Sequence, residues 1–376
     1  MKTEVTRARI SGEGTGPAGW AAGMTVALPL GASGAPLWGT RETTVTVAEC
    51  ARVLSATDTG RLREICAFTE RAPRSSRLPF SYQRLPVWAR DLAGTVIGRA
   101  RKRGMNKRFP RWPLDLSVDF IADAVGLPNP LSSGPAPVLL THDLDTPEGL
   151  RNAVQLFAPL EADLGARSAN YVVPCGWPLD HGLLRDLEDR GHEIGVHGFD
   201  HSNRTAFAAA REQAYRLDAG LAALSNYHVS GYRSPSLYRT RSLFGALAER
   251  YRYDSSIPTS GGLFPVPGNG CATARPFRVA PGGIVEMPLT LPRDGSLKFL
   301  GQDPAAILAL WVKSAQAIAL SGGIVSLLTH CEARFCGSPE MLRAYRSFVA
   351  FLAGDERFYF TTPTRLLDQI GMDATA

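Results

Sequence analysis

Two histidines in the second half of the chain have a spacing that suits a metal site. His197 and His201 lie four residues apart in HGFDH, so their imidazoles share a face if the segment coils helically. Neutral imidazole nitrogens are ligands for zinc and related divalent ions. Histidine pairs at this spacing also arise by chance, so the pair alone is a weak indication.

Two aspartates in THDLD strengthen this interpretation. Asp143 and Asp145 follow the apolar run Val138–Leu140, and in an extended segment their side chains point to the same side. Close carboxylates repel each other, which raises the pKa of one of them, and a bound cation removes that cost. We therefore expect Asp145 to complete a metal site with the two histidines. Asp143 would stay unligated and serve as a base for a water molecule. The alternative interpretation is that these two aspartates only cap a helix or form a turn, and it would be favoured if the histidine pair were absent.

The elements that must position these residues alternate in the manner of parallel βα units. We expect strands at Val138–Leu140, Ser168–Val173, Glu193–Val196, Ile284–Leu289, Gly323–Leu328 and Phe358–Thr361. We expect helices at Pro147–Ala162, Leu179–Asp189, Ala206–Leu224, Thr240–Arg250, Pro304–Leu320, Pro339–Leu352 and Pro363–Ile370. Four acidic or histidine-bearing motifs directly follow predicted strands, where parallel β/α proteins place their chemistry.

The first third of the chain has a different pattern. The Pro/Gly/Ser stretch Leu127–Pro137 cannot continue a helix or a central strand, which indicates a domain boundary. Before it, MTVALPL (24–30) and TTVTVAE (43–49) predict strands, and segments 61–70 and 87–103 predict helices. We divide the chain into an α+β extension of unknown role, residues 1–134, and a catalytic domain, residues 135–376.

The motifs together resemble a known family. THDLD, HGFDH, Arg233-Ser-Pro235 and Leu328-Thr-His330 occur in the order and approximate spacing of the polysaccharide deacetylase family, the NodB-homology carbohydrate esterases of family 4. The resemblance covers about Val138 to Ile370, and the joint set is specific although each motif is weak. It implies a distorted (β/α)7-type barrel and a metal-dependent N-deacetylase. THDxD, with YDSS and EMPLT downstream, is similar to the branch associated with surface-polysaccharide and small-glycan biosynthesis.

The resemblance assigns roles position by position. Asp143 matches the general base, and Asp145, His197 and His201 match the metal ligands. Leu144 separates the two aspartates, which are usually adjacent in the family, so the ligand would be Asp145. Arg233 matches the arginine that orients the base, since an arginine beside a carboxylate keeps it ionised and fixes its rotamer.

The remaining positions concern the substrate side. His330 matches the general acid that protonates the departing amine, and Leu328 matches the apolar wall near the acetyl methyl group. Ser236 stands where the family commonly has an aromatic residue, although its backbone amide could still bind the oxyanion. We expect His142 to contact the substrate or to pack.

The tryptophan-bearing motif of the family is not evident, and Tyr253-Asp-Ser-Ser256 takes its place. The residue that polarises His330 therefore remains open among Asp254, Glu286 and Glu332. We place Asp254 first and count it among the substrate-side residues.

Composition limits the partners. The chain has 376 residues, of which 44% are hydrophobic and 20% charged, as in ordinary globular proteins. Seven basic residues lie close together, and they predict either a solvated face or a site for phosphate, nucleotide sugar or lipid headgroup: Arg99, Arg101, Lys102, Arg103, Lys107, Arg108 and Arg111. No nucleic-acid reading module accompanies this charge, so we expect no nucleic-acid partner. Six scattered cysteines without a CxxC pair, and no apolar run near ~20 residues, favour a cytoplasmic protein.

The expected substrate is an N-acetylated amino sugar in a glycan, a glycoconjugate or a sugar-bearing metabolite, and an anionic or lipid-linked one is an option. Zn²⁺ is the expected ion because two imidazoles and a carboxylate suit it, and Co²⁺ or Ni²⁺ could use the same ligands. Two alternatives stay open. One is another C–N hydrolase on the same scaffold, such as a deformylase or cyclic-amide hydrolase, and the other is a catalytically silent sugar-binding protein.

Overall fold

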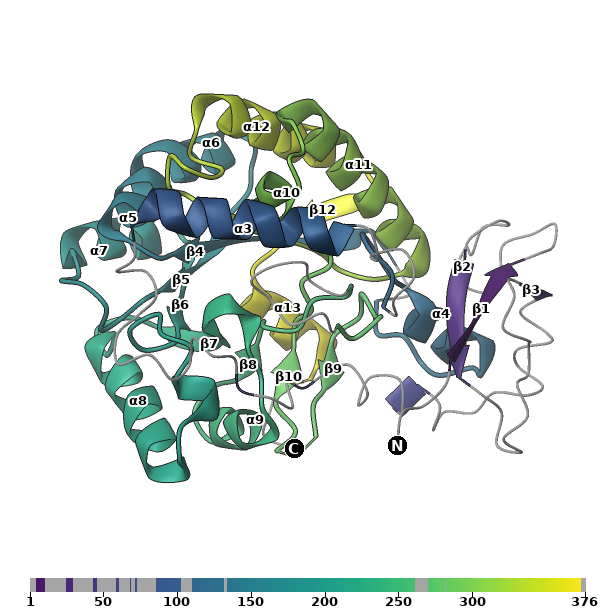
Figure 1. Ribbon diagram of the computed structural model, residues 1–376, viewed down its shortest axis with the longest axis horizontal. Coiled ribbons are helices and arrows are strands. Elements are labelled where there is room, and N and C mark those ends of the chain that lie inside the picture. The colour runs from purple at the N-terminus through teal and green to yellow at the C-terminus, as the bar shows by residue number, and fades with distance from the viewer. Residues whose placement is uncertain are drawn as a thin grey trace.

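A curled, nine-stranded sheet is the main feature of the chain (Figure 1). The computed structural model describes residues 5–10, 25–29, 43–45, 59–60, 68, 72, 86–102, 110–131, 134–260, 270–280 and 282–372. The sheet order is β11-β4-β5-β6-β7-β8-β10-β9, and β12 pairs with β4. All pairs are parallel except β9 with β10. The expected distorted β/α barrel is thus confirmed as a curled half-barrel.

The strand bounds mostly follow the apolar runs. They are β4 (Ala136–Leu144), β5 (Ser168–Val172), β6 (Glu193–His197), β7 (Val229–Arg233), β8 (Tyr253–Asp254), β9 (Phe277–Arg278), β10 (Val285–Glu286), β11 (Val325–His330) and β12 (Phe358–Phe360). The run predicted at Ile284–Leu289 is shorter than expected, because only its second and third residues pair as a strand. Leu289 makes an isolated bridge with Pro258.

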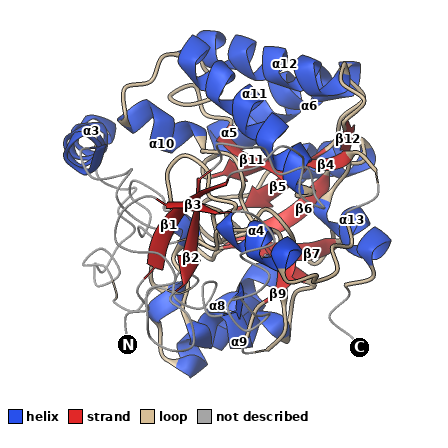
Figure 2. Cartoon of the chain, turned by 90° about the vertical axis from the view of Figure 1, so that its right-hand side faces the viewer, coloured by secondary structure: helices blue, strands red, loops and turns tan. Residues whose placement is uncertain are grey.

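Helices cover the outside of the sheet (Figure 2). They are α5 (Pro147–Asn152), η4 (Ala153–Phe157), α6 (Ala158–Asp163), α7 (His181–Asp189), η5 (Thr205–Phe207), α8 (Ala210–Ala223), η6 (Pro235–Leu237), α9 (Arg241–Ala248), α10 (Asp294–Phe299), α11 (Pro304–Ser321), α12 (Pro339–Ala353) and α13 (Pro363–Ile370). Several begin with a capping side chain followed by proline. Thr146, Asp303 and Ser338 each accept a backbone N–H in the first turn of a helix whose first residue is proline.

Helix α11 has the length and composition to cross a membrane, with 18 residues of hydropathy 1.3. In the fold it packs against α12 and β11. Trp311 on α11 is fully buried, and its indole N–H donates to Pro292 O at 2.8 Å. The helix therefore serves here as part of the layer that covers the sheet.

The first third of the chain contributes a small sheet and two helices to the described structure. The small sheet has the order β2-β1-β3, from β1 (Val5–Ile10), β2 (Thr25–Pro29) and β3 (Thr43–Val45), and β1 was not expected. The long helix α3 (Val87–Lys102) was expected from the sequence. The helix predicted over 61–70 falls outside the described residues except for Phe68. Helix α4 (Ser117–Ala124) packs its apolar side chains into the core of the barrel. The domain boundary after it stays a prediction.

Candidate active site

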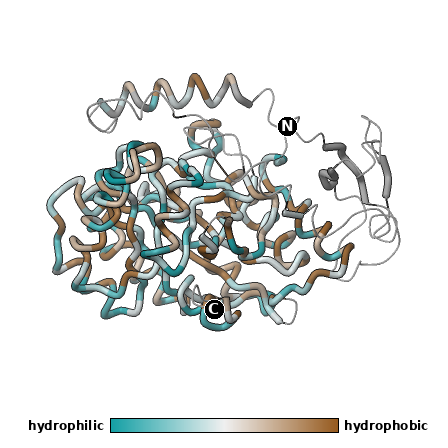
Figure 3. The backbone as a smooth tube through the Cα atoms, turned by 90° about the horizontal axis from the view of Figure 1, so that it is seen from below, coloured by the Kyte–Doolittle hydropathy of each residue, from teal (hydrophilic) through white to brown (hydrophobic). Residues whose placement is uncertain are grey.

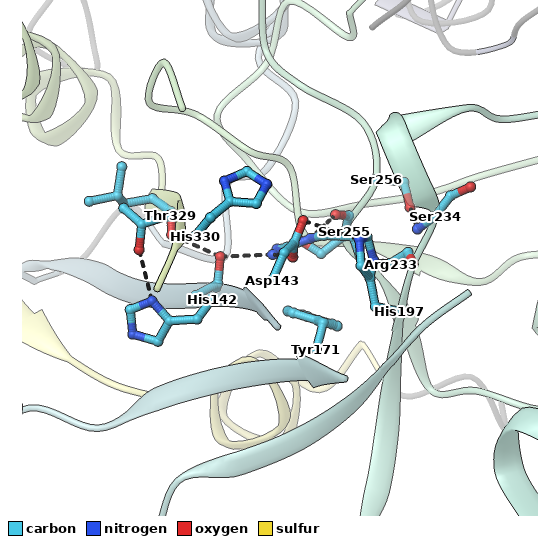
Figure 4. Close-up of polar contacts among 12 residues, drawn as sticks. His142, Asp143, Tyr171, His197, Arg233, Ser234, Ser255, Ser256, Thr329 and His330 are labelled. Atoms are coloured by element: carbon cyan, nitrogen blue, oxygen red, sulfur yellow. Dashed lines mark hydrogen bonds and ion pairs between the residues drawn. The ribbon is translucent and has the colours of Figure 1, made fainter. Parts of the chain in front are cut away.

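The predicted site residues converge at the carboxyl ends of neighbouring strands. Along β4 and β11, Asp143 is the register partner of His330. Along β6 and β7, His197 is the register partner of Arg233. All four side chains are buried, and Figure 4 shows them gathered at one end of the sheet. Parallel strand pairing therefore brings together motifs that are far apart in the sequence.

Asp145, His197 and His201 form a group whose ligand atoms all lie within 4.8 Å of one another. Asp145 Oδ1 is 3.4 Å from His197 Nε2 and 3.1 Å from His201 Nε2. The other nitrogen of His197, Nδ1, is 3.0 Å from the backbone oxygen of Arg233, which suits an N–H donor there. That hydrogen bond leaves Nε2 as the nitrogen with a lone pair for a cation. Two imidazoles and one carboxylate therefore fit a divalent ion such as Zn²⁺.

The two histidines reach this arrangement through a turn, and not through the helical coil that was the condition for their sharing a face. The described backbone has no helix between His197 and His201. Instead Gly198 (φ 67°) and His201 (φ 56°) adopt left-handed conformations. A Cβ atom on Gly198 would lie 2.4 Å from Pro235 Cγ, so the turn needs a glycine for both its conformation and its close contact.

Arg233 holds the proposed base. Its Nη1 donates to Asp143 Oδ1 at 2.9 Å and to Thr141 Oγ1 at 3.0 Å. Ser255 accepts from Nε through its backbone oxygen at 2.7 Å and from Nη2 through its hydroxyl at 2.8 Å. The guanidinium also lies 3.9 Å from the ring centre of Tyr171. This frame fixes one oxygen of Asp143.

The other oxygen of Asp143, Oδ2, lies 3.6 Å from His197 Nε2 and so faces the metal group. Burial acts to raise the pKa of Asp143, but the charges of His197 and Arg233 outweigh it and lower that pKa. The carboxylate is therefore ionised at neutral pH, as a base must be. Of the supporting residues, Ser255 belongs to the YDSS motif noted in the sequence, whereas no sequence signal indicated Tyr171.

His330 is polarised by Asp294, which the sequence did not indicate. His330 Nδ1 is 2.8 Å from Asp294 Oδ1, and the His330 backbone N–H donates to Oδ2 at 2.8 Å. Burial alone would lower the pKa of His330, but the charge and hydrogen bond of Asp294 outweigh it and help to raise that pKa to about 9. Since Nδ1 is engaged, Nε2 is the nitrogen that can face a substrate. The arrangement favours a protonated imidazole, as a general acid requires.

The three carboxylates considered as partners of this histidine have other partners, so placing Asp254 first was wrong. Asp254 accepts hydrogen bonds from the backbone N–H and the hydroxyl of Ser256, both at 2.9 Å, and burial raises its pKa. Glu286 accepts a backbone N–H. Glu332 accepts from the Thr146 hydroxyl at 2.8 Å, and burial raises its pKa to about 7.

Three leucines form an apolar cluster in the region expected to face the acyl group. Leu328 packs with Leu237 and Leu289, and all three side chains are buried. Ser236 and Leu237 both have positive φ, at 52° and 54°. Such conformations cost energy in residues other than glycine and often mark functional turns. The roles of Ser236 in binding an oxyanion and of Leu328 in contacting the acyl methyl stay predictions.

His142 lies on the other side of β4 from Asp143, as Figure 4 shows. Its Nδ1 is 2.8 Å from Thr329 Oγ1 and its Nε2 is 2.7 Å from Glu161 Oε1. The side chain is fully buried. Of the two expectations for His142, packing fits this geometry, and a substrate contact does not.

Comparison with known proteins agrees with the fold. No family model and no curated protein matches the chain. Among solved structures it is similar to a Mycobacterium smegmatis protein assigned to the polysaccharide deacetylases, with 18% identity and a TM-score of 0.51, over 63% of this chain and 91% of that one. It is also similar to Puue allantoinase, with 14% identity and a TM-score of 0.52, over 69% of this chain and 97% of that one. The chain therefore has the NodB-homology, carbohydrate-esterase-4-like fold, which confirms the resemblance noted in the sequence at the level of fold.

Proposed function

We propose that the chain is a metal-dependent hydrolase that removes the acetyl group from an N-acetylated amino sugar in a glycan, a glycoconjugate or a sugar-bearing metabolite. One observation carries the proposal. A carboxylate and two imidazoles are grouped as a cation site, and a second carboxylate, Asp143, lies beside them with one oxygen held by Arg233. His330, the register partner of Asp143, supplies an acid.

Zn²⁺ is the proposed ion, and Co²⁺ or Ni²⁺ could use the same donors. When bound, such an ion would polarise the amide carbonyl and make a water molecule more acidic. Asp145, His197 and His201 would hold it. The hydrogen bond from His197 Nδ1 to the Arg233 backbone oxygen fixes the orientation of that ring.

The chain's own residues then divide the proton transfers. Asp143 accepts a proton from the attacking water as the new carbon–oxygen bond forms, while Arg233 keeps its carboxylate oriented. His330 donates a proton to the amide nitrogen, and the carbon–nitrogen bond breaks. The products are acetate and the free amine of the sugar. The cluster of Leu328, Leu237 and Leu289 supplies an apolar surface for the small methyl group.

Mass spectrometry of reaction products would test this proposal. The zinc-loaded protein is incubated with a panel of N-acetylated sugars, nucleotide sugars and glycosylated metabolites, and one substrate is expected to lose a single acetyl group as acetate appears. Asp143→Asn should abolish this turnover while the protein keeps its metal. Tyr215→Ser, an exposed position on α8, is the control and should leave the rate unchanged.

The same assay separates the alternatives. Allantoinase, which has the same fold at a similar TM-score, makes hydrolysis of a cyclic amide the second candidate. Ring opening adds water to the substrate and releases nothing, and a deformylase releases formate. A silent sugar-binding protein would bind a panel member without turnover. An Asp143→Asn protein that works as fast as the unmodified chain would refute the proposed mechanism in any of these reactions.

A further inference from the structure

Helix α3 lies at the rim of the barrel that carries the active site (Figure 1). It packs on α10, whose first residue is Asp294, the partner of His330. The contact is made through glycines. A Cβ atom on Gly94 would lie 2.6 Å from Phe299 Cε1, and one on Gly98 would lie 2.6 Å from the Phe299 backbone oxygen. The inner face of α3 is therefore fixed closely against the helix that supports the proposed acid.

An ion-pair cluster reinforces this contact. Asp91 on α3 pairs with Arg334, and its other oxygen lies 3.4 Å from Lys298 Nζ. Arg334 is 4.5 Å from the ring centre of Phe335, and that ring lies 4.8 Å from the ring of His330. Helix α3 is thus connected to the active-site rim through a short chain of contacts.

The outer face of α3 carries an exposed apolar row. Trp88, Leu92 and Val96 are spaced by four residues and are 71%, 61% and 57% exposed. The described residues include six exposed large hydrophobic side chains, and these are three of them. The other three, Leu156, Tyr215 and Leu320, lie on three different elements. Single exposed apolar side chains are ordinary, whereas a row along one helix indicates a surface that binds something apolar.

Charge indicates what that surface binds. The only acidic residue of α3 is Asp91, which is engaged with the barrel. The last turn of the helix and the sequence after it contain seven basic residues and no acidic one from position 99 to 114. An apolar helix face next to concentrated positive charge is the composition of helices that lie in the interface of anionic membranes.

We propose that the outer face of α3, defined by Trp88, Leu92 and Val96, binds an anionic lipid membrane. Figure 3 shows α3 along the outside of the molecule, where a planar surface can reach it. Binding would place the active-site rim close to the lipid headgroups. The consequence that the amino-sugar substrate carries a lipid rests on the proposed function, but membrane binding itself does not.

Vesicle flotation with the full chain tests the proposal. Binding is expected to phosphatidylcholine vesicles that contain phosphatidylserine and to be at least tenfold weaker to phosphatidylcholine alone or at high salt. The double substitution Leu92→Gln and Val96→Ser should reduce binding at least tenfold. The matched control, Tyr215→Ser with Leu320→Gln, removes two exposed apolar side chains elsewhere and should bind like the unmodified protein.

Three further measurements make the outcome decisive. Thermal melting and turnover of a water-soluble substrate should be the same in the α3 variant and the control, which excludes misfolding. Equal vesicle binding by both variants would overturn the proposal. So would a dimer in analytical ultracentrifugation that the α3 substitutions dissociate, because a second copy of the chain would then cover the row. Since flotation does not use the chemistry, its result is independent of whether the acetate assay succeeds.

Discussion

Replacing Asp294 with asparagine should change the pH dependence of the proposed reaction. Asp294 is the largest source of the raised pKa of His330, which stands at about 9 against an ordinary 6.5. Asparagine keeps the shape and one hydrogen-bond acceptor but loses the charge. Because burial still disfavours the imidazolium, the pKa of His330 should then fall toward or below its ordinary value.

The sign and size of the effect follow from this shift. A general acid works only while protonated, so kcat/KM of the native protein should decline as the pH rises through about 9. In Asp294→Asn the decline should begin at least one pH unit lower, which means a roughly tenfold lower rate on the alkaline side. The raised pKa also stabilises the fold. This contribution, up to about 3 kcal/mol for the shift from 6.5 to about 9, is complete below pH 6.5 and is lost as the pH rises through 9.

The assay is a pH profile of kcat/KM for the zinc-loaded protein with the best N-acetylated substrate, accompanied by melting curves at pH 6 and pH 10. Asp254→Asn is the matched control, because Asp254 is buried, has a raised pKa and lies at the position that the sequence favoured. It should leave the alkaline limb in place. Superimposable profiles for Asp294→Asn and the native protein, or a shift in the Asp254 variant alone, would refute the assignment of Asp294.

Three other perturbations have definite expectations. A chelator should abolish turnover and lower Tm, and Zn²⁺ should restore both, with a stabilisation of about 4 kcal/mol when the free ion exceeds its Kd a thousandfold. The His201→Ala protein should contain no bound metal by elemental analysis. Full activity without metal would contradict the proposed metal site. Gly198→Ala should destabilise the fold by roughly 1–3 kcal/mol in urea unfolding and weaken metal binding, because φ is 67° and Pro235 occupies the space of the new methyl group. Arg233→Lys should lower kcat roughly 10- to 100-fold with the metal content unchanged, since lysine cannot reproduce the guanidinium contacts, and an unchanged kcat would exclude the positioning role.

The parts of the site that local sequence determines were predictable. The period of an extended segment gave a common side to Asp143, in β4, and Asp145, the residue after that strand. The position of each motif after an apolar run placed the chemistry at one edge of the sheet. His330 could be placed for the same reason. These inferences need only the period of a strand and the geometry of parallel pairing.

The parts that depend on packing between distant segments were not predictable. Asp294 reaches His330 because α10 lies against the end of β11, and no motif surrounds Asp294 in the sequence. Asp254 belongs to a conspicuous motif, yet its carboxylate is used locally by Ser256. The left-handed turn at Gly198 likewise follows from contact with Pro235, which the spacing of the histidines alone cannot reveal.

The two faces of β4 show how the fold can orient a buried base. His142 and Asp143 are consecutive, so the strand directs them to opposite sides. Beneath the strand, Glu161 on α6 is 2.7 Å from His142 and accepts the Tyr345 hydroxyl at 2.6 Å from α12. Burial acts to raise the pKa of Glu161, but the charge and hydrogen bond of His142 outweigh it and lower that pKa.

Moving β4 would break the contact between His142 and the buried Glu161 carboxylate, so this pair resists displacement of the strand. The contacts of His142 therefore fix the strand from below, while Arg233 fixes the carboxylate of Asp143 from above. Each group proposed for proton transfer is thus held by a residue from another element: Asp143 by β7 and His330 by α10. This division lets the positions of base and acid depend on the packed barrel rather than on the loops that follow their strands.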